Sequence, residues 1–123
     1  MDRRVEEILS FMRDNIHLRL SVDEMARRVS VSPSRLRQIF REETGTSPVR
    51  YLRKLRMARA KELLESTFLS VKEVAAKAGL NSISHFVTNF ENTFGRSPSA
   101  YRAARSGKAA RTSARPRSSR KGQ

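Results

Sequence analysis

Apolar residues recur every three or four positions along most of the first hundred residues, which is the spacing of an amphipathic helix. The first stripe runs from Val5 to Ile16 and predicts a helix over about residues 2–15. Because the spacing is helical nearly throughout, the pattern predicts an all-α fold.

Helix starts are marked by hydroxyl residues. Ser21 and Glu24 have the spacing of a capping box, in which each side chain accepts a bond from the other residue's backbone N–H, and the same pair returns as Ser70 and Glu73. Ser-Pro pairs, which place a cap before proline at the first helical position, stand at residues 32–33, 47–48 and 97–98. A glycine precedes each of the last two pairs and is expected to end the helix before it.

These signals belong to an internal repeat. The segment SVDEMARRVSV at 21–31 matches SVKEVAAKAGL at 70–80, and one inserted residue later Phe40 aligns with Phe90 and Tyr51 with Tyr101. Each copy is a short helix, a tight turn and a longer helix, which is the helix-turn-helix arrangement. We therefore expect one unit at about 21–45, a second at about 70–95, and a linker helix at about 48–66.

The length of the linker helix suggests how the two units are used. Nineteen residues rising 1.5 Å each span roughly 28 Å. With the packing offset of each unit added, this approaches the roughly 34 Å pitch of B-DNA. One chain, bound as a monomer, can then place helices 33–44 and 83–94 in two successive major-groove segments.

The charge of the chain predicts a polyanionic partner. The net charge is +14 and the pI about 11.5, which favours nucleic acid first and an anionic membrane second. Residues 102–123 contribute +8 with no acidic residue, so residues 1–101 carry +6. We expect a domain at 1–103 and a disordered Arg/Lys-rich tail at 104–123 that adds salt-sensitive, non-specific affinity or serves only for solubility.

Several kinds of chemistry are not expected. The chain has no Cys, and its two histidines, His17 and His85, lie far apart without a cluster of carboxylates, so we expect no metal and no cofactor. No acid–base pair, phosphate-binding glycine loop or small-molecule site is visible, which argues against an enzyme. There is no apolar leader and no run near the roughly 18 apolar residues of a membrane span.

Helix 33–44 offers a basic face opposite its apolar stripe. Arg37 can donate two bonds to guanine O6 and N7, and Gln38 can pair with adenine N6 and N7. We expect Arg41 to contact a DNA phosphate, and Arg35 to contact either a phosphate or no part of the DNA. Alternatively, these side chains are ordinary solvated helix residues. The predicted base contacts on this helix are Ser34, Arg37 and Gln38.

Helix 83–94 lies within a run, 78–95, that contains no Lys or Arg. Its predicted outward residues can contact thymine methyl groups or donate a hydroxyl to a base edge, whereas Glu91 repels phosphate. The alternative is that this helix packs beside the DNA backbone as a structural copy. Its predicted base contacts are Ile83, Ser84, Val87 and Thr88. Further phosphate contacts are predicted at Arg50, Arg53, Lys77 and Arg96.

The segments SPSRLRQIFREETGTSPVRYL (32–52), RMARAKELL (56–64) and VAAKAGLNSISHFVTNFENTFGRSPSAYR (74–102) resemble the DNA-binding domain of the AraC/XylS family of bacterial transcription regulators. The resemblance covers about residues 5–102. It implies seven helices, double-stranded promoter DNA as partner, base contacts on helix 33–44 and activation through RNA polymerase. From the missing leader and membrane span we expect a cytoplasmic, nucleoid-associated protein. This chain departs from the family at Thr88 and Glu91, near which basic residues are common.

Many members of that family carry a separate effector-binding or dimerising domain. The chain looks like a small stand-alone member or like the C-terminal piece of a longer regulator. Two other functions compete with that of a sequence-specific regulator. One is a non-specific architectural DNA-binding protein driven by the tail, and the other is an Ada-type repair enzyme, which requires a reactive Cys.

Overall fold

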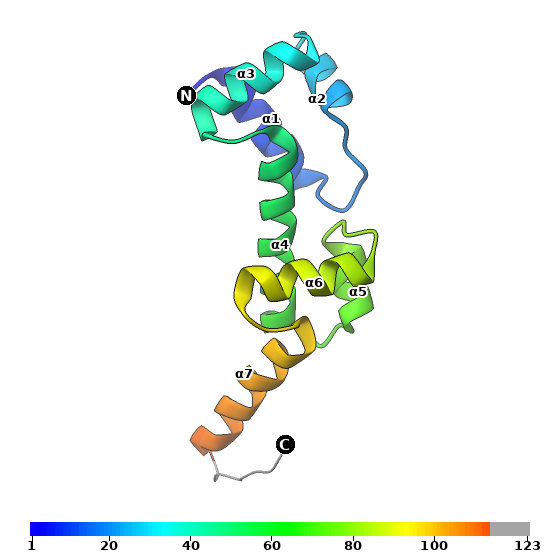
Figure 1. Cartoon of the computed structure of the whole chain (residues 1–123), viewed down its shortest axis with the longest axis vertical. Helices are drawn as coiled ribbons and strands as arrows, with labels where there is room; N and C mark the ends of the chain where they lie inside the picture. The colour runs from blue at the N-terminus through cyan, green and yellow to red at the C-terminus, as the bar shows by residue number, and fades with distance from the viewer. Residues whose placement is uncertain (114–123) are drawn as a thin grey trace.

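The computed structural model describes the backbone of residues 1–113 and the side chains of residues 1–106, and in this part of the chain all regular structure is helical (Figure 1). The prediction of an all-α fold with seven helices is confirmed. The bounds predicted for the two longer helices of the repeat, 33–44 and 83–94, are those observed. The helices are α1 (Arg3–Asp14), α2 (Val22–Arg28), α3 (Pro33–Thr44), α4 (Pro48–Ser66), α5 (Val71–Lys77), α6 (Ile83–Phe94) and α7 (Pro98–Ser113).

The helices begin where the hydroxyl residues predict. The Ser32 and Ser47 hydroxyls accept bonds from the backbone N–H groups of Arg35 and Arg50 at 3.1 and 3.2 Å, with proline in the first turn of each helix. α3 and α6 both end at a glycine in the left-handed conformation whose N–H bonds the carbonyl four residues back at 2.8 Å. Local sequence therefore fixes these helix ends.

One predicted capping box is formed and the other is half formed. Ser70 and Glu73 exchange both bonds, at 2.8 and 3.0 Å. Ser21 accepts from the Glu24 N–H at 3.1 Å, but the return bond to Glu24 is not among the hydrogen bonds of the described residues, so that prediction is wrong in this respect. The backbone explains the difference, because φ is −114° at Ser21 and −67° at Ser70, which turns the two N–H groups in different directions.

Each helix-turn-helix unit has its own hydrophobic core. In the first unit α1, α2 and α3 pack with the start of α4, and in the second α5, α6 and α7 pack with the rest of α4. A matching aromatic pair lies in each core, with ring centroids 5.5 Å apart for Phe40 and Tyr51 and 5.6 Å apart for Phe90 and Tyr101. The repeat in the sequence is therefore a repeat in packing.

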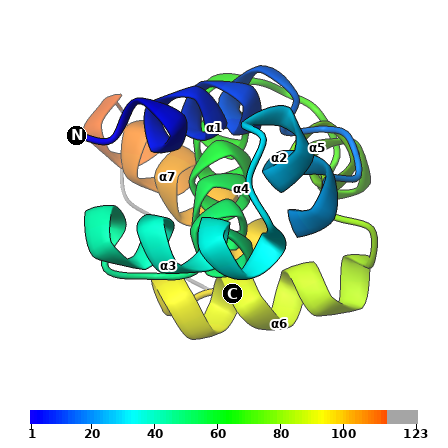
Figure 2. The ribbon, with the colours of Figure 1, turned by 90° about the horizontal axis from the view of Figure 1, so that it is seen from above.

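The linker helix α4 lies between the two units along the long axis of the molecule (Figure 1). Seen from above, α3 and α6 lie on the same side of α4, and α1 lies on the opposite side (Figure 2). The two longer helices of the repeat thus share one face of the molecule.

The last helix continues past the predicted domain boundary at residue 103. α7 ends at Ser113, so its last ten residues overlap the segment 104–123 for which a tail was predicted. Residues 104–113, ARSGKAARTS, are rich in Ala, Arg and Lys, which have high helix propensity. The rest of the predicted tail, residues 114–123, lies outside the described residues.

The turns inside the two units have equivalent left-handed residues of different type. Ser30, between α2 and α3, has φ of 58°, and Gly79, its equivalent 49 residues later, has φ of 80°. A Cβ atom at Gly79 would lie 2.0 Å from the Ile16 carbonyl oxygen and 2.8 Å from Arg56 Nε. Glycine is therefore required at residue 79 by both its conformation and its neighbours.

Exchanging the two residue types tests this difference. Gly79→Ser is expected to lower the free energy of unfolding by about 2–4 kcal/mol, because it adds left-handed strain and overpacking. Ser30→Gly is expected to change it by less than about 1 kcal/mol, since relief of strain is offset by the greater freedom of glycine in the unfolded chain. Urea denaturation of both variants measures the difference, and equal effects would contradict the packing at Gly79.

Candidate nucleic-acid interface

α3 presents a polar face opposite its buried stripe. Leu36 and Phe40 are fully buried, and Ile39 is 3% exposed, so the core holds one side of the helix. The other side is open to solvent and carries two guanidinium groups and an amide. The structure brings together on this face all four residues predicted for it, which are Ser34, Arg37, Gln38 and Arg41.

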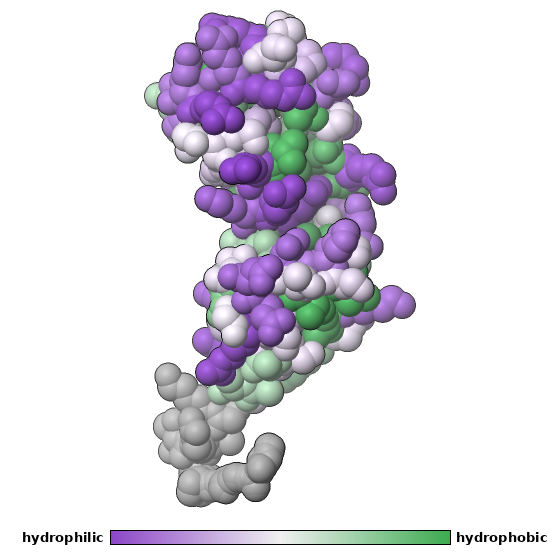
Figure 3. Space-filling view, viewed as in Figure 1, coloured by the Kyte–Doolittle hydropathy of each residue, from purple (hydrophilic) through white to green (hydrophobic). Residues whose placement is uncertain are grey.

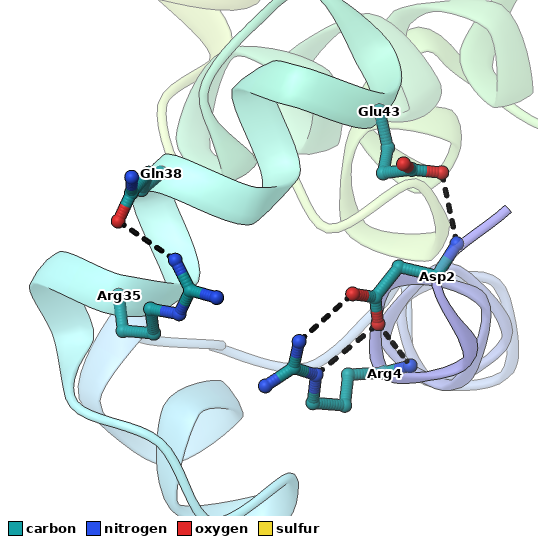
Figure 4. Close-up of polar contacts among 5 residues, drawn as sticks. All are labelled: Asp2, Arg4, Arg35, Gln38 and Glu43. Atoms are coloured by element: carbon teal, nitrogen blue, oxygen red, sulfur yellow. Dashed lines mark hydrogen bonds and ion pairs between the residues drawn. The ribbon is translucent and has the colours of Figure 1, made fainter.

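Two of the predicted contact residues on α3 are bonded to each other (Figure 4). Arg35 Nη1 donates to Gln38 Oε1 at 2.9 Å, one turn apart on the exposed surface. The bond occupies one lone pair of the amide oxygen and turns the Gln38 Nε2 donor outward. Arg35, for which a phosphate contact or no contact was predicted, therefore has an intramolecular partner in Gln38.

The end of α3 is tied to the start of α1 (Figure 4). The backbone N–H of Asp2 donates to Glu43 Oε1 at 2.8 Å. Asp2 also caps α1 and pairs with the Arg4 guanidinium at 2.9 Å, and these bonds to Arg4 lower the pKa of the Asp2 carboxyl to about 2. The Asp2 carboxylate is thus ionised at neutral pH. Through the bond to Glu43, the start of α1 holds α3 on the side opposite the polar face of α3.

α6 is held in the same way as α3 but presents different chemistry. Phe86 and Phe90 are buried, and Ser84, Thr88 and Glu91 are exposed. Ile83 is 41% exposed at the first turn. The predicted contact face of α6 thus carries hydroxyl, methyl and carboxylate groups, and the helix contains no Lys or Arg.

Val87 differs from the prediction that placed it on the exposed face. The structure leaves it half-buried. Val87 lies only about 100° around the helix from buried Phe86, at the edge of the core stripe. Its methyl groups therefore have less free surface than those of Ile83.

The linker helix supplies basic side chains to a groove that also borders one side of α6. Arg53 of α4 lines a groove between the two units together with His85 and Asn89 of α6. On the face seen in Figure 3, hydrophilic residues cover most of the first unit, and each unit shows an apolar patch beside polar residues. The two units thus differ in the side chains that α3 and α6 expose although their folds repeat.

The remaining predicted phosphate contacts do not form one cluster. Arg50, near the start of α4, and Arg96, after α6, are exposed. Lys77, at the end of α5, lines a separate groove whose walls come from the end of α1, from α4 and from α5. The structure therefore does not bring Lys77 together with the residues of α3.

Sequence reasoning missed two arginines that bind backbone carbonyls. Arg56 Nε donates to the Ile16 carbonyl at 3.2 Å and Nη2 to the Leu18 carbonyl at 2.6 Å, and burial lowers the pKa of its guanidinium. Arg102 Nε donates to the Leu64 carbonyl at 3.2 Å, and Nη1 donates to the Leu69 carbonyl. A signal for Arg56 was available, because it stands four residues after Leu52 and so falls on the buried stripe of α4.

Two further features of the described residues bear on function. Among them, no group of three His, Cys, Asp or Glu side chains is placed to hold a metal ion. In the same part of the chain, no helix has both the length and the apolar character needed to span a bilayer.

The fold and the paired faces have counterparts in known proteins. A family model described as a helix-turn-helix domain matches residues 25–104. The HTH-type transcriptional regulator GbdR of Pseudomonas aeruginosa is 37% identical over 95 residues, which are 77% of this chain and 26% of GbdR. The HTH-type transcriptional activator RhaS of Escherichia coli is 32% identical over 104 residues, which are 85% of this chain and 37% of RhaS. The chain spans about a quarter to just over a third of the length of these curated relatives.

Solved structures agree with this similarity. The DNA-binding domain of AdpA, a global transcriptional factor in complex with a target DNA, has a TM-score of 0.79 and 31% identity, covering 89% of this chain and 95% of that one. A regulator with an AraC-type DNA-binding domain from Chromobacterium violaceum has a TM-score of 0.77 and 35% identity, covering 84% and 92%. The arrangement of helices seen here is thus shared with a domain whose structure was solved on DNA.

Proposed function

Because the chain belongs to the AraC family of helix-turn-helix DNA-binding transcription regulators, we propose that it binds an asymmetric promoter site with α3 and α6 in two successive major-groove segments. The observation that supports this most is the position of both helices on the same side of α4 (Figure 2). A 19-residue linker spans roughly 28 Å, which suits groove segments one turn apart and a site of roughly 20 base pairs.

In this proposal α3 reads bases and supplies most of the attraction within the domain. Arg37 donates to guanine O6 and N7, Gln38 contacts an adenine, and Ser34 contacts a base edge at the first turn. Their exposure on one helix face supports these roles. The phosphate contacts proposed around them are Arg35, Arg41, Arg50, Arg53, Lys77 and Arg96.

α6 is proposed to refine which sequence is chosen rather than to add electrostatic affinity. Ile83 and the partly exposed methyls of Val87 can contact thymine methyl groups, and the hydroxyls of Ser84 and Thr88 can bond a base edge. Arg53, in the groove beside α6, offers a phosphate contact that α6 itself lacks.

The wider role is proposed from the relatives. RhaS is named a transcriptional activator, which supports activation through contact with RNA polymerase. Two units in one chain support binding as a monomer, and the family supports action in the cytoplasm at the nucleoid. The domain proposed to bind DNA is 1–103, with the basic segment 104–123 adding non-specific affinity.

Substitution of Arg37 tests base reading by α3. Arg37→Ala is expected to cost about 1–3 kcal/mol on a site obtained by in vitro selection and to relax the preference for one base pair, because a bidentate bond is lost. Arg37→Lys keeps the charge without the bidentate geometry and is expected to relax the same preference with a smaller loss on random DNA. Fluorescence anisotropy on selected and random duplexes measures both, and an equal loss on both duplexes with Arg37→Ala would mean that Arg37 is only a charge.

Substitutions on α6 test whether this helix enters the groove. Val87→Ala and Thr88→Ala are each expected to change base preference in one half of the site only, since each removes a group that faces the bases. Thr93→Ala, on another side of the same helix, serves as the control. Selected-site sequencing gives the preferences, and a footprint of about one helical turn that neither variant alters would contradict groove entry.

Removal of the basic C-terminal segment separates specific from non-specific binding. Truncation after Arg105 leaves the first two turns of α7, with Tyr101 and Arg102, in place. Specificity is expected to persist, while the slope of log affinity against log salt falls by about 0.9 for each phosphate contact removed. Affinity measured across salt concentrations checks this, and complete loss of binding would instead support a non-specific architectural protein.

A further inference from the structure

Three segments that are distant in sequence meet at the middle of α4. Arg56 reaches from α4 to the segment between α1 and α2, where it donates to the carbonyls of Ile16 and Leu18. These two residues belong to the first helix-turn-helix unit. A charged group that bonds two carbonyls holds that segment more firmly than a neutral donor would.

The turn of the second unit closes on the same point. Gly79 lies against Ile16 and Arg56. A Cβ atom at residue 79 would be 2.0 Å from the Ile16 carbonyl oxygen and 2.8 Å from Arg56 Nε. The turn between α5 and α6 therefore lies against the Ile16 carbonyl that Arg56 binds. This junction of Arg56, Gly79 and the 16–18 segment connects the two units directly, alongside their connection through α4.

The junction matters because the two units have separate cores. α4, a helix of 19 residues, also joins them, and long helices curve gently rather than staying straight. Arg102 makes similar bonds, but its partners Leu64 and Leu69 lie within the second unit and its end of α4. Arg56 is thus placed to fix one unit against the other, and Arg102 is not.

We propose that Arg56 and Gly79 fix the separation and the angle between α3 and α6, and that they thereby set the single spacing of half-sites to which this protein binds tightly. The proposal rests on the function proposed above, in which both helices read DNA. In it Arg56 is a positioning residue that touches no base.

The geometry can be measured without DNA. The chain has no Cys, so Glu42→Cys and Asn92→Cys, equivalent exposed positions on α3 and α6, can carry two spin labels. Double electron–electron resonance is expected to give one narrow distance distribution for the otherwise unaltered chain and a broader one with Arg56→Gln. Arg59→Gln removes the same charge from the same helix, at a residue that pairs with Glu62, and is expected to leave the distribution narrow.

The spacing preference is measured on DNA. Starting from a selected site, base pairs are added or removed between the two half-sites, and each two base pairs turn one half by roughly 70° relative to the other. The unaltered chain is expected to lose about tenfold or more in affinity for a two-base-pair change, whereas Arg56→Gln is expected to lose less than about threefold, with its affinity for a single half-site unchanged. Arg59→Gln should follow the unaltered chain.

The outcomes separate the two proposals. A narrow distribution that Arg56→Gln leaves unchanged, or an unchanged spacing profile, overturns the role of Arg56. If the unaltered chain shows no spacing preference, reading by two helices fails, while the spin-label distances still decide whether Arg56 joins the units. Should Arg56→Gln fail to fold, Arg56→Lys keeps the charge but cannot donate to both carbonyls in the same geometry, and the same two measurements decide.

Discussion

The division of α4 between two hydrophobic cores is the constraint on which the rest of the structure depends. Its start contributes Leu52 to the core of the first unit, and its later turns contribute Met57, Ala60 and Leu64 to the core of the second. Neither unit can bury its apolar face without this helix. The two units are therefore joined through α4, and α3 and α6 both lie on one side of it (Figure 2).

Within that frame the two copies of one motif have taken on different chemistry. The equivalent positions in the repeat are Arg37 and Val87, Gln38 and Thr88, and Arg41 and Glu91. Each basic or amide side chain of α3 thus corresponds to a smaller or acidic side chain in α6. The cores, by contrast, repeat closely, down to the paired rings of Phe40 with Tyr51 and Phe90 with Tyr101. Packing holds the fold fixed while the exposed faces diverge, because an exposed substitution costs little stability.

Much of the fold could be predicted because its signals are local. Ser32, Ser47 and Ser82 bond backbone groups three residues away, and such spacing is visible in the sequence. The exposed face of α3 could be predicted for the same reason, because it lies opposite the helically spaced apolar residues of the same helix. Prediction was wrong at the capping box of Ser21 and Glu24, where the spacing is present in the sequence but only one of the two bonds is formed.

The sequence by itself determined the bounds of α3 and α6, the repeat and the outward face of α3, since these follow from spacing along a single helix. Only the tertiary structure decided that Arg56 binds the carbonyls of Ile16 and Leu18, some 40 and 38 residues away, and that Gly79 closes on the same place. Backbone carbonyls have no sequence signature, because every residue carries one. Which carbonyl an arginine meets depends on how the two units pack, and that is a property of the whole fold.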